Sequence, residues 1–379
     1  MTVTEEYRWP CAQCGAKLRF APGQTELVCD HCGHVQAISD ASPEVASSAL
    51  GELDLWRGLS DDLPATAMEE VRATSCPSCG ALVEFQGATH ATECPFCASP
   101  VVVDTGAHRQ IKPQALIPFA LTEGQARDAL TKWLGRLWFA PSKLLEFTRK
   151  GRAMAGIYVP YWTFDADTRS RYRGQRGEHY YETRTVTVQV NGKSEQRQEQ
   201  VRKTRWYPAS GTVARDFDDV VIIASAALPK RLGDGLEPWT LSALTAYSPD
   251  YLAGFQAEGY TVSLKDGHAE GRARMSQVIE QDVRRDIGGD EQRIDSVNTD
   301  WSDETFKHVL LPVWSAAYKY NNKSYRFLVN GQTGEVQGER PWSVWKIVGT
   351  VVLVVVVVVA VVYLTDPEAL GLPRPSWMN

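Results

Sequence analysis

The sequence predicts a multidomain α+β protein with two small four-cysteine modules near the N-terminus, a β-rich middle region and one transmembrane helix near the C-terminus. Three observations support this organisation. All eight cysteines fall into CxxC pairs, the middle of the chain alternates apolar and polar residues between turn signals, and an uncharged apolar run follows position 346. With 379 residues and 43% hydrophobic content, the chain is long enough for about two or three compact units.

The cysteines form two matched quartets. The members are Cys11, Cys14, Cys29 and Cys32 in the first quartet and Cys76, Cys79, Cys94 and Cys97 in the second. Each quartet has 14 residues between its two pairs, and the motif repeats after 65 residues. Four thiolates in this pattern are typical of a closed tetrahedral site for structural zinc. We therefore expect two rubredoxin-like zinc ribbons that bind two zinc ions.

The residues around the cysteines favour a zinc ribbon over other uses of paired cysteines. Gly15 and Gly80 directly follow the second cysteine of each quartet, where a zinc knuckle needs a positive φ angle. A thioredoxin-type redox role is the alternative, but such motifs come singly beside a βαβ unit. His31, His34 and His90 lie nearby and could act as ligands or contact the ligands, although surface or packing roles are expected for them.

The order of parts along the chain follows from these motifs and from shifts in composition. The expected parts are zinc ribbon 1 (7–38), an acidic linker (39–72), zinc ribbon 2 (73–104), a helical segment (105–152), the β-rich α+β domain (153–342), the transmembrane helix (345–364) and a short tail (365–379). The linker assignment rests on eight acids against two arginines between Asp40 and Ser75. An apolar island around Leu55 and Trp56 predicts either a docking helix for a partner or packing within the chain.

Two main helices are predicted in the middle of the chain. Thr122 and Gln125 have capping-box spacing, and the apolar residues that follow up to Leu137 share one helical face. A longer amphipathic helix is indicated by apolar residues at helical spacing between Met275 and Ile287. Most of the remaining middle region has the alternation that is typical of strands.

The β-rich domain contains a faint internal similarity. The segment 157–166 (IYVPYWTFDA) resembles the segment 309–318 (VLLPVWSAAY), with a proline and a tryptophan at matching positions. A hairpin signal, Asn-Gly in one case and Asn-Asn in the other, follows each segment. These features predict an internal duplication that gives two related β-sheet halves.

The uncharged run from Ile347 to Leu364 predicts a transmembrane helix. As a helix it would span roughly 27 Å, close to the hydrocarbon thickness of a bilayer. In lipid a helix satisfies its own backbone hydrogen bonds, whereas a lone strand does not. Arg340 and Lys346 precede the run against Arg374 after it, and zinc thiolates need a reducing compartment. We expect a single-pass protein of the cytoplasmic membrane whose N-terminal bulk is cytosolic.

One stretch is strongly basic although the whole chain has a formal net charge of −6. Residues 169–206 contain ten bases and four acids, with tyrosines interleaved. The bases considered for contact with an anionic surface are Arg169, Arg171, Arg173, Arg176, Arg202, Lys203 and Arg205. A solvated hairpin face is the default expectation here, and contact with lipid, protein or single-stranded nucleic acid are the alternatives.

The sequence carries no recognised catalytic motif. It lacks a GxxxxGK[ST] phosphate-binding loop, a GxSxG nucleophile elbow and an HExxH metal-binding pair. Because four thiolates leave no open position on zinc, catalysis at the metal is not expected either. We therefore predict that the protein is not an enzyme.

Several features together resemble a bacterial family of tandem zinc-ribbon, single-pass membrane proteins. They are the two CxxCG ribbons, the IPF segment at 117–119, the VPYWTFDA segment at 159–166 and the late membrane helix. Members are often labelled zinc-ribbon or replication-restart-helicase-like proteins, and some relatives are associated with flotillin-like and phage-shock-protein-A-like proteins in envelope stress. Unwinding activity is not expected, because the chain lacks a nucleotide-binding loop.

The resemblance implies a zinc-binding, membrane-anchored scaffold or adaptor that recruits protein partners to the cytoplasmic membrane face in envelope stress. The alternative function is a membrane-tethered nucleic-acid-binding zinc-ribbon protein. The position of the basic charge separates the two, because the bases lie in the middle domain and hardly at all in the ribbons.

Overall fold

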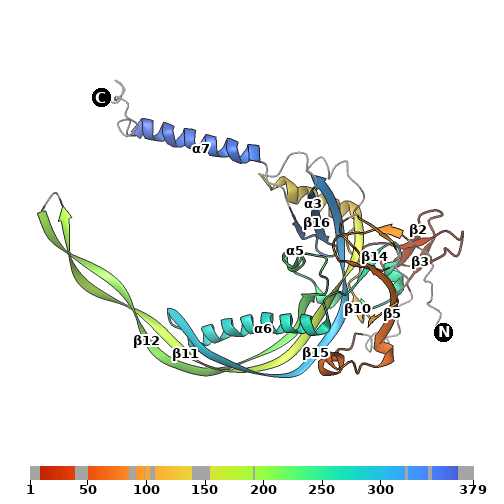
Figure 1. The fold of residues 1–379 in the computed structure, drawn as a ribbon, viewed down its shortest axis with the longest axis horizontal. Helices are drawn as coiled ribbons and strands as arrows, with labels where there is room; N and C mark the ends of the chain where they lie inside the picture. Colours follow the sequence, from red (N-terminus) through yellow and green to blue (C-terminus); the bar gives the residue numbers. More distant parts are fainter. Residues whose placement is uncertain are drawn as a thin grey trace.

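A computed structural model describes residues 9–38, 50–84, 91–97, 99–102, 107–138, 154–190, 193–320, 323–339 and 344–365. The described part is rich in β-strands and has few helices, as the sequence predicts. Figure 1 shows a body that holds the N-terminal modules, a long curved β-ribbon that leaves the body, and the apolar helix α7 (Val344–Thr365), which projects from it.

Three long strands build the ribbon: β11 (Ala155–Val190), β12 (Lys193–Ile223) and β15 (Glu291–Tyr320). β11 lies in the middle and pairs antiparallel with both neighbours. β12 pairs with β11 as far as the last residue of β11, Val190, whereas β15 begins at Glu291, opposite Gly177. Residues 178–190 and 193–205 therefore extend beyond the third strand as a two-stranded ribbon. Register shifts in both pairings interrupt the ladders, and such bulges bend strands.

Helix α6 (Leu264–Ile287) covers the concave face of this sheet (Figure 1). The Ser263 side chain caps its start, and Gly288 ends it with a φ of 65°. The predicted apolar face is confirmed, because four of its residues from Met275 to Ile287 are buried against the strands. A Cβ at Gly267 would lie 2.6 Å from Trp162, so glycine is needed where the helix comes closest to the sheet.

The remaining strands extend the sheet across the body. It has 12 strands, with β13–β10–β15–β11–β14–β6–β5–β9 in order and β4, β12, β16 and β17 attached beside this path. Their bounds are β4 (Leu53–Asp54), β5 (Met68–Ser75), β6 (Leu82–Glu84), β9 (Ala107–Ile111), β10 (Ala115–Leu116), β13 (Thr245–Ala246), β14 (Gln256–Gly259), β16 (Lys323–Asn330) and β17 (Val336–Gly338).

The short elements lie around this sheet. Ribbon 1 has its own three-stranded sheet of β1 (Leu18–Phe20), β2 (Glu26–Cys29) and β3 (Val35–Ala37), and ribbon 2 adds the pair β7 (Ala91–Glu93) and β8 (Pro100–Val102). The short helices are α2 (Leu55–Leu59), α5 (Lys230–Asp234), η1 (Ala65–Ala67), η2 (Leu241–Ala243) and η3 (Pro249–Leu252). Helix α3 (Glu123–Gly135) begins with the predicted capping box between Thr122 and Gln125.

The segment expected to be an acidic linker packs on the body from residue 50 onward. β4 pairs with β15, and Leu55 in α2 is fully buried beside Phe306. The neighbouring Trp56 is 60% exposed. The apolar island thus packs mainly within the chain, because the sheet offers it an apolar surface. Residues 39–49 of the expected linker, and 139–152 of the expected helical segment, lie outside the described residues.

The two similar segments of the β-rich domain lie side by side in the sheet. They belong to β11 and β15, where Ile157 pairs with Val313 and Trp162 pairs with His308. Each strand then continues into an antiparallel partner, β12 or β16, as the hairpin signals predict. The turn residues at 191–192 and 321–322 lie outside the described residues. The duplication itself remains a prediction.

Candidate metal centres and contact surfaces

The first cysteine quartet converges on one point at the edge of ribbon 1. The Cys11 and Cys32 sulfurs are 3.6 Å apart, and those of Cys14 and Cys29 are 3.5 Å apart. All four sulfurs lie within 4.8 Å of one another. Sulfurs held about 2.3 Å from a tetrahedral zinc ion are roughly 3.8 Å apart, whereas a disulfide would bring them to about 2 Å. The donor set and its spacing fit one zinc ion.

The second quartet repeats this arrangement. The Cys76–Cys97 and Cys79–Cys94 sulfur distances are both 3.6 Å, and these four sulfurs also lie within 4.8 Å of one another. The two predicted four-cysteine sites are therefore confirmed as groups that could each hold a metal ion, and zinc suits four thiolates best. Histidines belong to neither group. His31 is exposed, His34 is half-buried, and His90 lies outside the described residues.

Glycines shape the knuckles that present the sulfurs. Gly15, Gly33 and Gly80 have φ angles of 73°, 73° and 77°. Each donates its N–H to the carbonyl of the first cysteine in its pair, at 2.8 to 2.9 Å. The positive φ expected for Gly15 and Gly80 is confirmed. Gly33 plays the same part in the second knuckle of ribbon 1, and its place directly after Cys32 was the signal in the sequence.

In each site one thiol is the preferred thiolate, because the pKa of Cys29 and that of Cys79 are lowered. Burial and the neighbouring thiols raise the pKa of Cys14 and Cys32 in the first site and of Cys76 and Cys94 in the second. The backbone N–H of Cys32 lowers the pKa of Cys29 to about 6. A hydrogen bond from the Cys94 thiol lowers the pKa of Cys79 to about 5. Since metals bind the deprotonated sulfur, a lowered thiol pKa reduces the cost of losing protons when the ion enters.

The two ribbons attach to the body in different ways. Ribbon 1 keeps its own sheet and is held by backbone and side-chain contacts: the Phe20 N–H donates to the Ala253 carbonyl at 2.8 Å, and Trp9 Nε1 donates to Asp250 at 2.9 Å. Ribbon 2 instead contributes β6 to the large sheet, next to β14. A metal ion bound in ribbon 2 would therefore stabilise a strand of the body itself.

Helix α7 is the one helix in the described part of the chain that is long and apolar enough to cross a membrane. The window Trp345–Val362 has a mean hydropathy of 2.8, and none of it is buried. Its valines are each about half exposed, for example Val354 at 55% and Val357 at 52%. The membrane location and the orientation remain predictions.

The seven basic residues considered for contact with an anionic surface all lie on the long β-ribbon, but not on one face of it. Side chains alternate between the faces of a strand. The strand register divides these basic residues into two groups. One group lies on the convex face, and the other lies on the concave face, which α6 covers nearer the body. The first group is Arg169, Arg171, Arg173 and Arg202, and the second is Arg176, Lys203 and Arg205.

Acidic residues accompany several of these bases. Arg171 lies 3.1 Å from Asp300, which comes from β15, and Arg176 lies 2.8 Å from Glu178. Lys203 pairs with Glu182 across the two-stranded part. Exposed pairs such as these contribute little to stability, but they reduce the positive field of the β-ribbon. The sequence could not reveal Asp300, because it lies 129 residues after Arg171.

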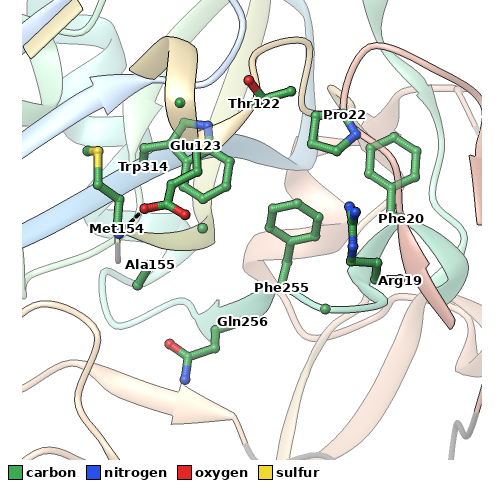
Figure 2. Close-up of a pocket in the computed structure, with 13 residues that line it drawn as sticks. Arg19, Phe20, Pro22, Thr122, Glu123, Met154, Ala155, Phe255, Gln256 and Trp314 are labelled. Atoms are coloured by element: carbon green, nitrogen blue, oxygen red, sulfur yellow. Dashed lines mark hydrogen bonds between the residues drawn. The ribbon is translucent and has the colours of Figure 1, made fainter. Parts of the chain in front are cut away.

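A cavity of about 630 Å³ lies where ribbon 1 meets the sheet (Figure 2). Phe20, Phe255 and Trp314 line it, with ring centroids 5.8 to 6.2 Å apart from one ring to the next. The charged side chains that line it already have partners, because Arg19 binds Asp30 and Glu123 accepts the backbone N–H of Met154. The cavity therefore offers mainly apolar and aromatic contacts. No signal in the sequence pointed to it.

Comparison with known proteins gives a distant match. No protein-family model matches the chain, and no solved structure matches it. The chain is 25% identical over 240 residues to the Bacillus subtilis (strain 168) protein named "Uncharacterized protein YdjG". The match covers 62% of this chain and 66% of that protein, so the chain spans slightly less than two thirds of the length of this relative.

Proposed function

We propose that the protein is a membrane-anchored scaffold or adaptor. Helix α7 would hold it in the cytoplasmic membrane, and the zinc ribbons with the β-rich region would bind protein partners on the cytosolic side. The observation that carries the proposal is the exposure of α7 from Trp345 to Val362, whereas α3 and α6 each bury an apolar face. An apolar helix without protein cover is stabilised by lipid, where its backbone is satisfied and its valines leave water.

The zinc sites support a binding function on the reducing side. All eight cysteines are free thiols whose geometry fits closed sites, and such sites stabilise folds and do not activate water. Reduced thiols persist in the cytosol, which is the basis for the orientation. The partners proposed are flotillin-like or phage-shock-protein-A-like proteins of an envelope-stress response, and enzymatic activity is not proposed.

The test is an affinity purification of the detergent-solubilised full chain, with nuclease treatment and mass spectrometry. We compare the wild type with Cys76→Ser/Cys79→Ser, which removes ligands of ribbon 2, and with Ser78→Ala, which alters the same knuckle but keeps every ligand. Protein partners that survive nuclease, persist with Ser78→Ala and disappear with the double variant support the adaptor. Partners recovered equally from all three proteins would contradict a role for ribbon 2.

A second candidate is a membrane-tethered nucleic-acid-binding zinc-ribbon protein. The observation that favours it is the exposure of Tyr180 (38%) and Tyr181 (65%) among the basic residues of the long β-ribbon. Nucleobases of single-stranded nucleic acid stack on exposed aromatic rings of this kind. Recovery dominated by material that is sensitive to both nuclease and salt would favour this function over the adaptor.

A further inference from the structure

The outer edge of β12 carries no strand. Among the described strands, β12 pairs with β11 alone. An exposed sheet edge presents main-chain donors and acceptors to any extended segment that lies beside it. Most of this edge follows the projecting ribbon, but residues 217–221 lie in the body, where the edge lines a groove.

We call this the edge groove. It has a volume of about 360 Å³ and is lined by Phe217–Val221 of β12, by Arg274, Met275 and Val278 of α6, and by Glu237, Pro238 and Trp239 of the loop before η2 together with Leu241, the first residue of η2. The helix and the loop lie on opposite faces of the sheet. Trp162 faces α6, where it contacts Gly267, while its neighbour Tyr161 faces Trp239 at a ring distance of 6.0 Å. The strand edge is therefore flanked by an apolar wall on each side.

Both walls offer apolar surface that is not fully covered. Val278 of α6 and Leu241 of η2 are half-buried, and so are Phe217, Val220 and Val221 of the strand. At the Val221 end, Arg274 donates to the Val221 carbonyl at 2.6 Å and pairs with Glu237 at 2.8 Å. Arg274 thus closes this end, and an incoming segment would extend from it toward Phe217.

The other end of the groove is acidic. A bulge in the β11–β12 pairing places Asp218 and Asp219 here, and Asp219 has a φ of 52°. The Asp218 carboxylate lies within 4.8 Å of carboxylate oxygens of Glu52 and Asp165. Lys307 lies 2.9 Å from Asp219, 3.1 Å from Glu52 and 3.9 Å from Asp165, so three acids share one base, and Asp218 lies beside them. A ligand with a positive side chain at this end would complement the excess negative charge.

We propose that the edge groove binds an extended segment of a partner protein as an added strand beside β12. An aliphatic side chain of the segment contacts Val278 on the face that α6 covers, and a lysine or arginine lies near Asp218. Strand addition of this kind takes affinity from main-chain hydrogen bonds and specificity from pockets for side chains. The inference deepens the adaptor function, and it rests on that function for the class of ligand.

The test uses the purified full chain in detergent and an array of short Ser/Thr-rich peptides, each with one aliphatic residue and one lysine at varied spacing. The best binder is then remade with Glu in place of lysine, and with N-methyl groups that remove its main-chain donors. We expect N-methylation to weaken binding at least about tenfold, because several hydrogen bonds are lost. We expect a comparable loss from Val278→Trp, which fills the groove, and about a fivefold loss from the Lys→Glu peptide.

Gln277→Trp is the matched control, because it adds the same ring to an exposed position of α6 that does not line the groove. Binding within about twofold of the wild type is expected for it. The proposal is overturned if no peptide binds more tightly than about 1 mM. It is also overturned if either N-methylation or Val278→Trp leaves binding unchanged. If partners are recovered in the purification above while no peptide binds, the groove assignment fails and the adaptor function stands.

Discussion

Asp165 gives a counterintuitive prediction: its replacement by asparagine should stabilise the protein at neutral pH. Burial, together with the charges of Glu52 and Asp219, raises the pKa of this carboxyl from its ordinary value of 3.8 to about 6, against the lowering effects of the Asp219 backbone N–H and of Lys307. Between these two pH values the folded protein keeps a proton that the unfolded chain has lost. The free energy of unfolding therefore falls as pH rises from about 4 to about 6, and above that range the folded state bears the cost of a buried charge.

The magnitude follows from the size of the shift. Two pKa units correspond to about 3 kcal/mol. The Asp165 side chain is 12% exposed, so solvent screens part of this cost, and we expect Asp165→Asn to raise the free energy of unfolding by about 1–2 kcal/mol at pH 7.5. The amide oxygen can still accept the backbone N–H of Asp219, so the bulge keeps its hydrogen bond. For a folded part of roughly 300 residues, the gain corresponds to about 2–3 °C in Tm.

The assay is thermal unfolding in detergent, followed by tryptophan fluorescence at pH 7.5 and pH 5. The difference between Asp165→Asn and the wild type should shrink by about half at pH 5, where the wild-type carboxyl is largely protonated in the folded state. Asp167→Asn is the control, because Asp167 lies on the same strand but is exposed. A lower Tm for Asp165→Asn at pH 7.5, or a gain that is equal at both pH values, would refute the reasoning.

Further predictions concern the charged cluster, the zinc sites, the helix packing and α7. Lys307→Met should lower the free energy of unfolding by about 2–3 kcal/mol at pH 7.5, and by less at pH 5, because it leaves the half-buried carboxylates of Asp165 and Asp219 without a cation; an equal loss at both pH values would argue against this cause. Cys76→Ser/Cys79→Ser should reduce bound zinc, measured by elemental analysis, from about two ions per chain to about one, and should speed proteolysis of the large sheet more than Cys11→Ser/Cys14→Ser does. Gly267→Leu should cost about 1–3 kcal/mol in thermal unfolding, since its Cβ would lie 2.6 Å from Trp162, whereas the exposed Ala269→Leu should cost little. Val354→Lys/Val357→Lys should release the protein from carbonate-washed membranes, because each lysine costs about 2.5–3.5 kcal/mol at a helix centre, and retention equal to that of Val354→Ile/Val357→Ile would exclude a spanning α7.

Features set by neighbouring residues in the sequence were predictable. The cysteine quartets, the capping box of Thr122 with Gln125, the apolar face of α6 and the apolar run of α7 are all local patterns. Each depends on spacing within one element, which sequence periodicity reports directly. The structure agrees with the sequence at these places.

Features that depend on distant pairing were not predictable from the sequence. The acidic segment was expected to be a linker, yet Glu52 binds Lys307, 255 residues further along. The lengths of β11 and β12, and the acid that pairs with Arg171, likewise depend on strand register. Strand register depends on which face of each strand is buried against the rest of the fold, and amino-acid composition does not determine this. The charge count of residues 169–206 therefore overestimated how far the ribbon acts as one basic surface.

The two ribbons share a motif but differ in what their zinc would stabilise. In ribbon 1 the metal would stabilise a small sheet that contacts the body through interactions such as the hydrogen bond from Trp9 to Asp250. In ribbon 2 it would order β6, which pairs with β14, and β14 pairs with β11 at Ile157. The same strand β11 continues to Thr163 and Phe164, which pair with Val221 and Val220 of the edge groove. Loss of metal from ribbon 2 should therefore disturb the edge groove through the paired strands β6, β14 and β11, whereas loss of metal from ribbon 1 should disturb only the end of the body that holds ribbon 1.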